Sequence, residues 1–326
     1  MSQRFAIGMY DSLLAANAGV SLKSLHFDVD AIIKAADAIK PLADELGIDP
    51  PAPHIAGFGY PHVASLGASI EFPEDGEPNV FPMIKSPEDI DNLKEPDDYL
   101  AAPIIQTRLK IVAELGKRRK DAVSQRIGHP MEGPLTTAVL LMGQDFLMLP
   151  YDDPQRAHLL LSFCTESALH YIEALHRHYN GNDPMKPKPG GIPDDFAGML
   201  PPDMFGEFVV PYWNRIYEGL KATKRSLHSE LLREEHLPFL RELNISHYDP
   251  SADKYLNPEL LKNKCPCPFM SRIQAWEMRD LTAEQLESLY RKIAECKPSV
   301  IAFTIDDMNQ AEKAKHLLKV AREMAK

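Results

Sequence analysis

Apolar residues recur at three- and four-residue spacing along several long stretches of the chain, the pattern of helices that bury one face. The stretches with this spacing are residues 28–46, 103–115 and 153–179. Residues 86–89 add a helix start, because Pro suits the first helical position and two acidic residues follow in the first turn. We therefore expect a largely helical extension over about residues 1–120.

From about residue 123 the pattern changes to short apolar runs that alternate with longer helical stretches. The runs typical of strands are residues 123–128, 225–228, 246–248, 269–273 and 300–304. Helical stretches begin near residue 135 and cover residues 281–295 and 309–325. The proline-rich segments 184–193 and 266–268 predict loops. Such alternation predicts an α/β fold with a parallel sheet covered by helices.

A barrel fits this alternation better than an open sheet. No Gly-x-Gly-x-x-Gly follows a strand to mark a dinucleotide crevice. A length of 326 residues suits one (β/α)8 barrel, a TIM barrel, so we expect residues 1–326 to form a single domain together with the helical extension.

The composition narrows the class of protein. An apolar share of 44% and a charged share of 25% are those of a globular chain with a large core. The net charge of −11 argues against a nucleic-acid partner, which calls for clustered Lys and Arg. We find neither a secretory signal nor an apolar run of membrane length. Four cysteines are too few for a disulfide scaffold, so we expect a cytoplasmic protein. The sequence leaves open whether the chain forms a homodimer.

In a barrel of this kind the chemistry lies at the carboxyl ends of the strands. His228 and Glu230 follow one such strand and point to the same side of it, because side chains on a strand alternate faces. An imidazole and a carboxylate in one cavity are suitable ligands for zinc. The alternative interpretation is an exposed His and Glu at the end of a strand. The other candidates near strand ends are His129, Asp194, Asp195, His247, Asp249, Arg272, Gln274, Asp306 and Asp307.

The four cysteines offer a weaker metal hypothesis. Cys265 and Cys267 form a Cys-Pro-Cys unit, but they begin the strand that ends near Ile273, at the opposite end of the barrel from the expected site. Cys164 lies on the apolar face of a helix and Cys296 near a helix end, where cysteine usually serves packing.

Several segments resemble the uroporphyrinogen decarboxylase superfamily in order and spacing. They are residues 128–138, 193–205, 226–228 and 237–243. The resemblance implies a (β/α)8 barrel. The decarboxylases of this superfamily carry an Arg-rich amino-terminal loop that binds the substrate's carboxylates, and residues 5–11 contain no arginine. Decarboxylation is therefore not expected.

A second branch of the superfamily, the corrinoid-dependent methyltransferases, is similar in residues 57–62 and 66–72. Its members bind zinc through a His-x-Cys pair and a later Cys. His228-x-Glu230 resembles that pair with a carboxylate in place of the thiolate, and Asp306 falls roughly where the later Cys lies. Asp306 as a helix cap is the alternative. A zinc ion with oxygen and nitrogen ligands keeps more positive charge, which suits polarising an ether rather than activating a thiol.

The resemblance is closest to the methyltransferases of O-demethylase systems. It implies an enzyme that cleaves the methyl ether of an O-methylated aromatic and passes the methyl group to the Co(I) of a separate corrinoid protein, with zinc as Lewis acid. A methylcorrinoid-protein:thiol methyltransferase, a metal-free lyase and a non-enzymatic corrinoid-binding role are the alternatives.

Further residues are given roles in the expected active site. Asp194 and Asp195 would orient the substrate or donate a proton, or else cap the helix before Phe196. We predict that the substrate is contacted by four side chains: His129, His247, Tyr60 and Gln274. For both histidines a structural role is the alternative, and for Tyr60 a place in the core.

Overall fold

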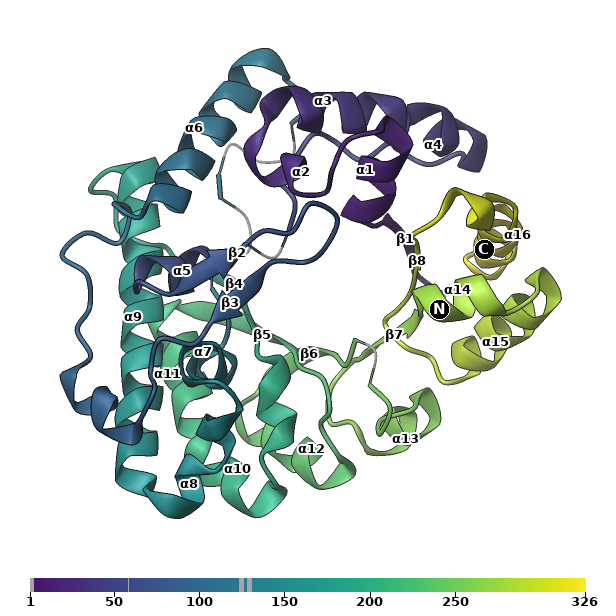
Figure 1. Ribbon diagram of the computed structural model, residues 1–326. Helices are drawn as coiled ribbons and strands as arrows, with labels where there is room; N and C mark the ends of the chain where they lie inside the picture. Colours follow the sequence, from purple (N-terminus) through teal and green to yellow (C-terminus); the bar gives the residue numbers. More distant parts are fainter. Residues whose placement is uncertain (1–2, 58, 123–125, 128–130, 252) are drawn as a thin grey trace.

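The computed structural model describes residues 3–57, 59–122, 126–127, 131–251 and 253–326. Six parallel strands of this described part lie along an arc, with helices on its outer side (Figure 1). In chain order the strands of the arc are β1 (Phe5–Met9), β4 (Lys188–Pro193), β5 (Ala222–His228), β6 (Ile245–Asp249), β7 (Met270–Ile273) and β8 (Val300–Ile305). A separate antiparallel hairpin consists of β2 (Ser69–Glu71) and β3 (Asn79–Phe81).

The helices occupy most of the remaining chain. Those of the first half are α1 (Asp11–Ala18), α2 (Ser24–Phe27), α3 (Val29–Ala38), α4 (Lys40–Leu46), α5 (Pro61–Ser65), α6 (Pro103–Arg118), α7 (Pro134–Met142), α8 (Leu149–Asp152) and α9 (Pro154–Asn180). Those of the second half are α10 (Pro202–Phe208), α11 (Val210–Gly219), α12 (Leu237–Glu242), α13 (Pro258–Lys264), α14 (Ala275–Asp280), α15 (Ala283–Glu295) and α16 (Ala311–Met324). Short 3-10 turns cover Pro87–Asn92, Gln144–Leu147, Asp195–Met199, Glu234–His236 and Met308–Gln310.

The strands follow one another around the arc in the order expected of a barrel. β4, β5 and β6 form one sheet, and β7, β8 and β1 form the other. A single parallel bridge between Tyr248 and Phe269 joins the two sheets. The predicted α/β class with parallel strands is thus confirmed, whereas no further strand closes the arc between β1 and β4 in the described residues. The predicted strand 123–128 falls largely outside the described residues.

Most predicted elements have a counterpart. The helical stretches 103–115 and 153–179 are α6 and α9. The stretch 28–46 is divided at Ile39 into α3 and α4. The four later strands are β5 to β8, each within three residues of its expected bounds.

Two segments differ from the expectation. Residues 5–9, inside the predicted helical extension, form β1 and pair in parallel with β8. The proline-rich segment 184–193 is only partly a loop, because Lys188–Pro193 is β4. β4 lies unusually close to β5, the strand beside it. A Cβ atom on Gly191 would lie 2.6 Å from Oγ of Ser226 on β5, so the close approach of the two strands requires glycine there.

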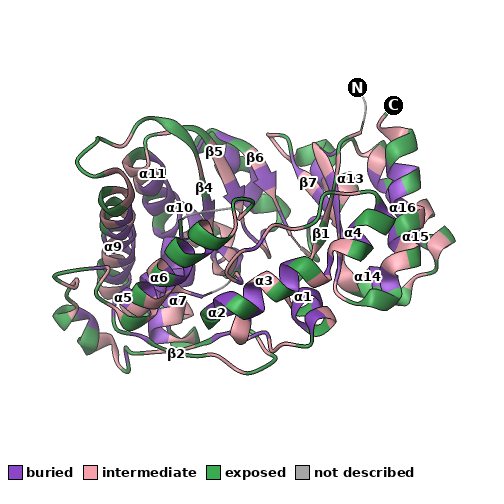
Figure 2. Cartoon of the chain, turned by 90° about the horizontal axis from the view of Figure 1, so that it is seen from above, coloured by how far each residue is buried: buried purple, intermediate pink, exposed green. Residues whose placement is uncertain are grey.

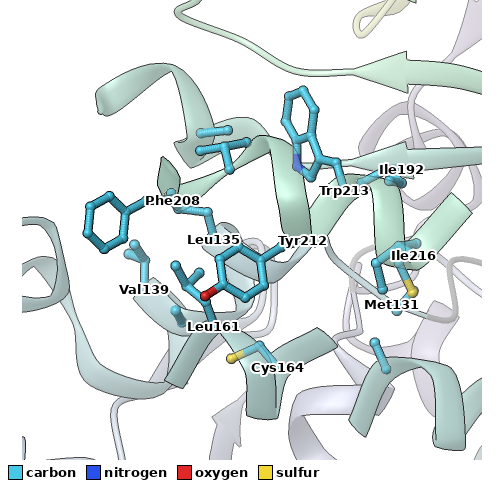
Figure 3. Packing of buried hydrophobic residues seen from close by; sticks show 14 of the residues in the cluster. Met131, Leu135, Val139, Leu161, Cys164, Ile192, Phe208, Tyr212, Trp213 and Ile216 are labelled. Carbon is cyan, nitrogen blue, oxygen red and sulfur yellow. The ribbon is translucent and has the colours of Figure 1, made fainter. Parts of the chain in front are cut away.

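The larger apolar core lies between β4 to β6 and the helices α7, α9 and α11. Figure 3 shows the buried side chains of α7, α9 and α11 that form part of it, among them Leu135, Leu161 and Trp213. A second core packs α1, α3, α15 and α16 around β1 and β8. Exposed residues lie mainly on the outer faces of the helices (Figure 2). No helix of the described chain is long and apolar enough to cross a membrane.

Candidate active site

Acidic and basic side chains meet where β4, β5, β6 and β7 end. The strand register aligns Pro193, His228 and Asp249, so Asp195, His228 and Asp249 belong to three adjacent strand ends. Arg272 is the next-to-last residue of β7. Nδ1 of His228 lies 3.0 Å from Oδ2 of Asp249, and Nε of Arg272 donates to Oδ1 of the same carboxylate at 3.2 Å. An Arg–Asp–His chain thus lines this part of the strand ends.

The charges of Arg272, Asp249 and His228 stabilise one another. Burial opposes ionisation of Asp249, but the hydrogen bonds from His228 and Arg272 hold its pKa well below the usual range. Burial likewise opposes protonation of His228, yet the carboxylates of Asp249 and Asp195 raise the pKa of the imidazole. His228 is therefore held with Nδ1 toward Asp249 and Nε2 toward Asp195.

Asp195 faces this Nε2 atom from the loop after β4. Its Oδ1 lies 3.4 Å from Nε2 of His228 and is buried without a hydrogen-bond partner in the described structure. Burial, together with the carboxylates of Glu230, Asp194 and Asp249, raises the pKa of Asp195 to about 6 against the lowering effect of His228.

Glu132 is the site residue that the sequence did not reveal. It lies just before α7, and burial raises the pKa of its carboxyl group to about 8, with further contributions from Asp195 and Asp194. It is therefore mostly protonated at neutral pH. Only its position within the family-like segment 128–138 could have drawn attention to it, because nothing in the local sequence shows that the side chain lies half-buried near other carboxylates.

Tyr60, the residue before α5, lies near these groups. Burial raises the pKa of its hydroxyl to about 12, and the negative charges of Glu132, Glu77 and Asp195 act in the same direction. Its backbone φ of 41° falls in the left-handed region, which is uncommon for an aromatic residue and is a form of strain often found at functional sites.

Asp194 and Asp195 have different positions although they are neighbours in sequence. Asp194 is fully buried and accepts hydrogen bonds from the backbone N–H of Thr136 at 2.7 Å and from Nε1 of Trp213 at 2.7 Å. It also accepts from Leu135 N at 3.3 Å, so it caps the start of α7 rather than a helix of its own segment. Asp194 is placed to hold α7 and α11 against the strand ends, whereas the side chain of Asp195 is partly exposed and contacts His228.

The other predicted residues are more scattered. Asp306 hydrogen-bonds to the side chain of Gln310 in the turn before α16. His247 lies 2.8 Å from Oγ of Ser299, which precedes β8, and so points toward the amino ends of the strands. Gln274 donates to the carbonyl of Ser251 and lines a cavity of about 540 Å³ that is bordered by α13, α15 and, through Ser271 and Arg272, by β7. His129 lies outside the described residues.

The proposed metal ligands can be compared with these positions. Nε2 of His228 and Oδ1 of Asp195 are a nitrogen–oxygen pair of the kind that zinc takes, but zinc sites in proteins have at least three protein ligands. Within the described residues no three His, Cys, Asp or Glu side chains are grouped to hold a metal, and the ligand set of His228, Glu230 and Asp306 stays a prediction from the resemblance. No step below is derived through zinc.

We expect Asp249→Asn to lower the pKa of His228. The asparagine keeps the shape but removes the negative charge that favours the imidazolium. Because the folded-state pKa of His228 is raised, its contribution to stability is present at low pH and is lost as pH rises through that pKa; the variant should lack this change. The imidazole resonances of His228, followed by NMR against pH, measure the shift. An unchanged pKa in Asp249→Asn would contradict the role given to Asp249.

Comparison with known proteins places this fold and site in a family. A family model described as uroporphyrinogen decarboxylase (URO-D) matches residues 61–254, more than half of the chain and including Glu132, Asp195, His228 and Asp249. Among solved structures, a methyltransferase from Methanosarcina mazei is similar over 99% of this chain and 94% of that one, with a TM-score of 0.68 at 16% sequence identity. No curated protein sequence matches the chain. The chain belongs to the uroporphyrinogen decarboxylase (URO-D) family.

Proposed function

We propose that the protein is a methyltransferase that cleaves the methyl ether of an O-methylated aromatic and transfers the methyl group to a corrinoid protein. The observation that carries the proposal is the grouping of Glu132, Asp195 and His228 at the strand ends, where burial raises the pKa of Glu132 to about 8 and that of Asp195 to about 6. The fold shared with a methyltransferase and the resemblance described above supply the reaction class.

An aryl methyl ether reacts slowly because phenolate is a poor leaving group. The C–O bond breaks more easily when the oxygen receives a proton as negative charge develops on it. A carboxyl group with a pKa near 8 still carries its proton at neutral pH and can give it up in this step. Glu132 is therefore assigned the general acid, and the electron pair of the breaking bond leaves with the oxygen as a neutral phenol.

The remaining residues position the ether and the proton. Nε2 of His228 and Oδ1 of Asp195 are in contact at 3.4 Å; from this position both groups can hydrogen-bond to the phenol oxygen beside them and relay a proton from solvent to Glu132 after turnover. Asp249 and Arg272 keep the imidazole fixed from behind. A corrinoid, when presented by its own protein, supplies a Co(I) nucleophile that takes the methyl group.

The positions of the cysteines support an ether over a thiol as the substrate. All four lie in the described part of the chain, and all four are free. Cys164 is buried in α9, Cys265 and Cys267 lie between α13 and β7, and Cys296 ends α15. None of them is near His228 along the strand ends, as a thiol-activating zinc site of the branch would require.

The test is methyl transfer from methoxylated aromatics to free cob(I)alamin. We expect loss of the cob(I)alamin absorbance together with one phenol released per methyl group transferred, and a decrease of about 100-fold or more in His228→Ala. His170→Ala, which changes an exposed histidine of α9, is the control. Release of CO2 from carboxylated substrates without phenol would instead identify a decarboxylase and contradict the proposal.

Zinc stays a prediction from the resemblance, and metal analysis tests it separately. The protein is purified without chelators, and zinc is measured per chain in the wild type and in His228→Ala. About one zinc per chain that is lost in the variant would support His228 as a ligand. An active wild type without zinc would overturn the prediction and leave proton donation by Glu132 as the activating step.

A further inference from the structure

Two of the four cysteines are in contact with each other on the turn between α13 and β7. Sγ of Cys265 and Sγ of Cys267 lie 3.8 Å apart and share a hydrogen bond. The chain bends at Pro266 and Cys267, and this bend brings the two sulfurs together. The proposed methyl transfer makes no use of the pair, so its chemistry can be considered separately.

The two thiols differ in their readiness to lose a proton. Both are half-buried, so both can still be reached from solvent. The hydrogen bond from the thiol of Cys267 lowers the pKa of Cys265, whereas the same contact and burial raise the pKa of Cys267. Because a thiolate, and not a thiol, attacks a disulfide, Cys265 has the properties of an attacking sulfur with Cys267 beside it to resolve the product.

The other two cysteines are differently placed. Cys164 is fully buried in α9, and burial raises the pKa of its thiol. Sγ of Cys296 donates to the backbone carbonyl of Lys292 at 3.7 Å, at the end of α15. Both belong to the described part of the chain, and neither is in contact with a second sulfur there.

The residues after the pair connect it with the strand that carries His228. The carbonyl of Pro268 accepts a hydrogen bond from the backbone N–H of Tyr248 at 2.9 Å. Phe269 forms the bridge with Tyr248 that joins the two sheets. The hydroxyl of Tyr248, a fully buried residue, donates at 2.9 Å to the carbonyl of Ser229, the residue after His228. A short series of hydrogen bonds therefore runs from the cysteine turn to the candidate site.

We propose that Cys265 and Cys267 are a redox modification site, which forms a reversible disulfide by exchange with small-molecule disulfides such as oxidised glutathione. The thiolate of Cys265 attacks one sulfur of the disulfide RSSR, forms a mixed disulfide and releases RS⁻, which takes up the proton of Cys267. The sulfur of Cys267 then attacks Sγ of Cys265 and releases the second RS⁻, which takes up the proton that Cys265 had given to solvent. Two protein thiols are oxidised, and one RSSR is reduced to two RSH.

The disulfide would alter the turn on which it forms. Its sulfurs have to approach from 3.8 Å to the bond length of about 2.05 Å. The turn is closely packed, so we expect this approach to displace Pro268, whose carbonyl holds Tyr248. The displacement would be passed by Tyr248 to Ser229 and to the imidazole next to it. Since disulfides in reducing compartments are usually transient, the bond fits a regulatory modification better than a permanent crosslink.

The experiment follows the free thiols of the wild type in mixtures of reduced and oxidised glutathione. The protein is quenched with acid, alkylated and digested with trypsin, which cleaves after Lys264 and Arg272 and leaves both cysteines in one peptide. We expect this peptide to lose both alkylation sites together and to be lighter than the dithiol by two hydrogen atoms, and reduced dithiothreitol should restore both thiols. Glutathione adducts in place of the internal bond, or thiols that stay free in oxidised glutathione, would overturn the proposal.

Single variants separate the pair from the other thiols. Cys267→Ser keeps the attacking sulfur and removes the resolving one, so we expect a glutathione adduct at Cys265 and no internal bond. Cys296→Ser removes a half-buried cysteine that has no sulfur partner and should leave oxidation of the pair unchanged. The wild-type measurement decides the proposal even if Cys267→Ser fails to fold.

The link to the candidate site has a readout of its own. The imidazole resonances of His228 are compared by NMR in the reduced and the oxidised wild type, and we expect them to shift on oxidation. Tyr248→Phe, which removes the hydroxyl that donates to Ser229, should reduce this shift while the disulfide still forms. Resonances that do not move on oxidation would overturn the link to His228. Neither measurement requires methyl transfer, so both stand apart from the proposed function.

Discussion

Replacing Asp194 with alanine is expected to lower the free energy of unfolding by about 3 to 5 kcal/mol, the loss typical of an uncompensated buried polar network. The carboxylate is fully buried and accepts from two backbone N–H groups of α7 and from the indole of Trp213. Alanine leaves all three donors buried without an acceptor, and each such donor costs about 1 to 3 kcal/mol. Urea unfolding at pH 7, followed by Trp fluorescence, measures the change.

The adjacent aspartate provides the matched control. Asp195→Asn changes one carboxylate in the same loop, but the Oδ1 atom of Asp195 has no hydrogen-bond partner to lose. We therefore expect its unfolding free energy to stay within about 1 kcal/mol of the wild type, while methyl transfer falls. A stability loss of equal size in both variants would show that Asp194 has no special structural role.

This division between two neighbouring aspartates shows where sequence reasoning ends. The order of strands and helices, and the rule that active sites follow strand ends, identified Asp194, Asp195 and His228 as candidates. The rule cannot say which side chain turns inward to the core. That depends on Gly133, whose missing side chain lets the start of α7 approach: a Cβ atom there would lie 2.4 Å from Cβ of Asp194.

β4 is the element that the sequence missed, because it depends on packing against a distant part of the chain. β4 contains two prolines and two glycines, a composition that argues against a strand, yet Gly191 is what allows β4 to lie close to Ser226. Asp306 was matched to a ligand position by its place in the chain; its hydrogen bonds with Gln310, four residues away, fit the alternative of a helix cap, and its role as a ligand stays a prediction.

Replacing Glu132 with glutamine is expected to lower the rate of methyl transfer by about 100- to 10,000-fold, the usual contribution of a general acid. Glutamine keeps the size and polarity of the side chain but cannot release a proton. In the wild type, kcat/KM should decrease as pH rises above about 8, where Glu132 loses its proton, and this decrease should be absent from the residual activity of Glu132→Gln. Glu173→Gln, an exposed change on α9, should leave both rate and pH profile unaltered.

The same substitution should change stability in the opposite direction to activity. The pKa of Glu132 is about 8 in the folded protein against an ordinary value of 4.5, so between these pH values the folded state binds a proton that the unfolded state releases. The free energy of unfolding therefore falls as pH rises through this window, and Glu132→Gln should escape that fall. Urea unfolding at pH 5 and pH 9 measures it: the variant should gain stability relative to the wild type at pH 9. A variant that loses activity but gains no stability at pH 9 would show that Glu132 is not held protonated by burial, and the proton donor would have to be sought at Asp195.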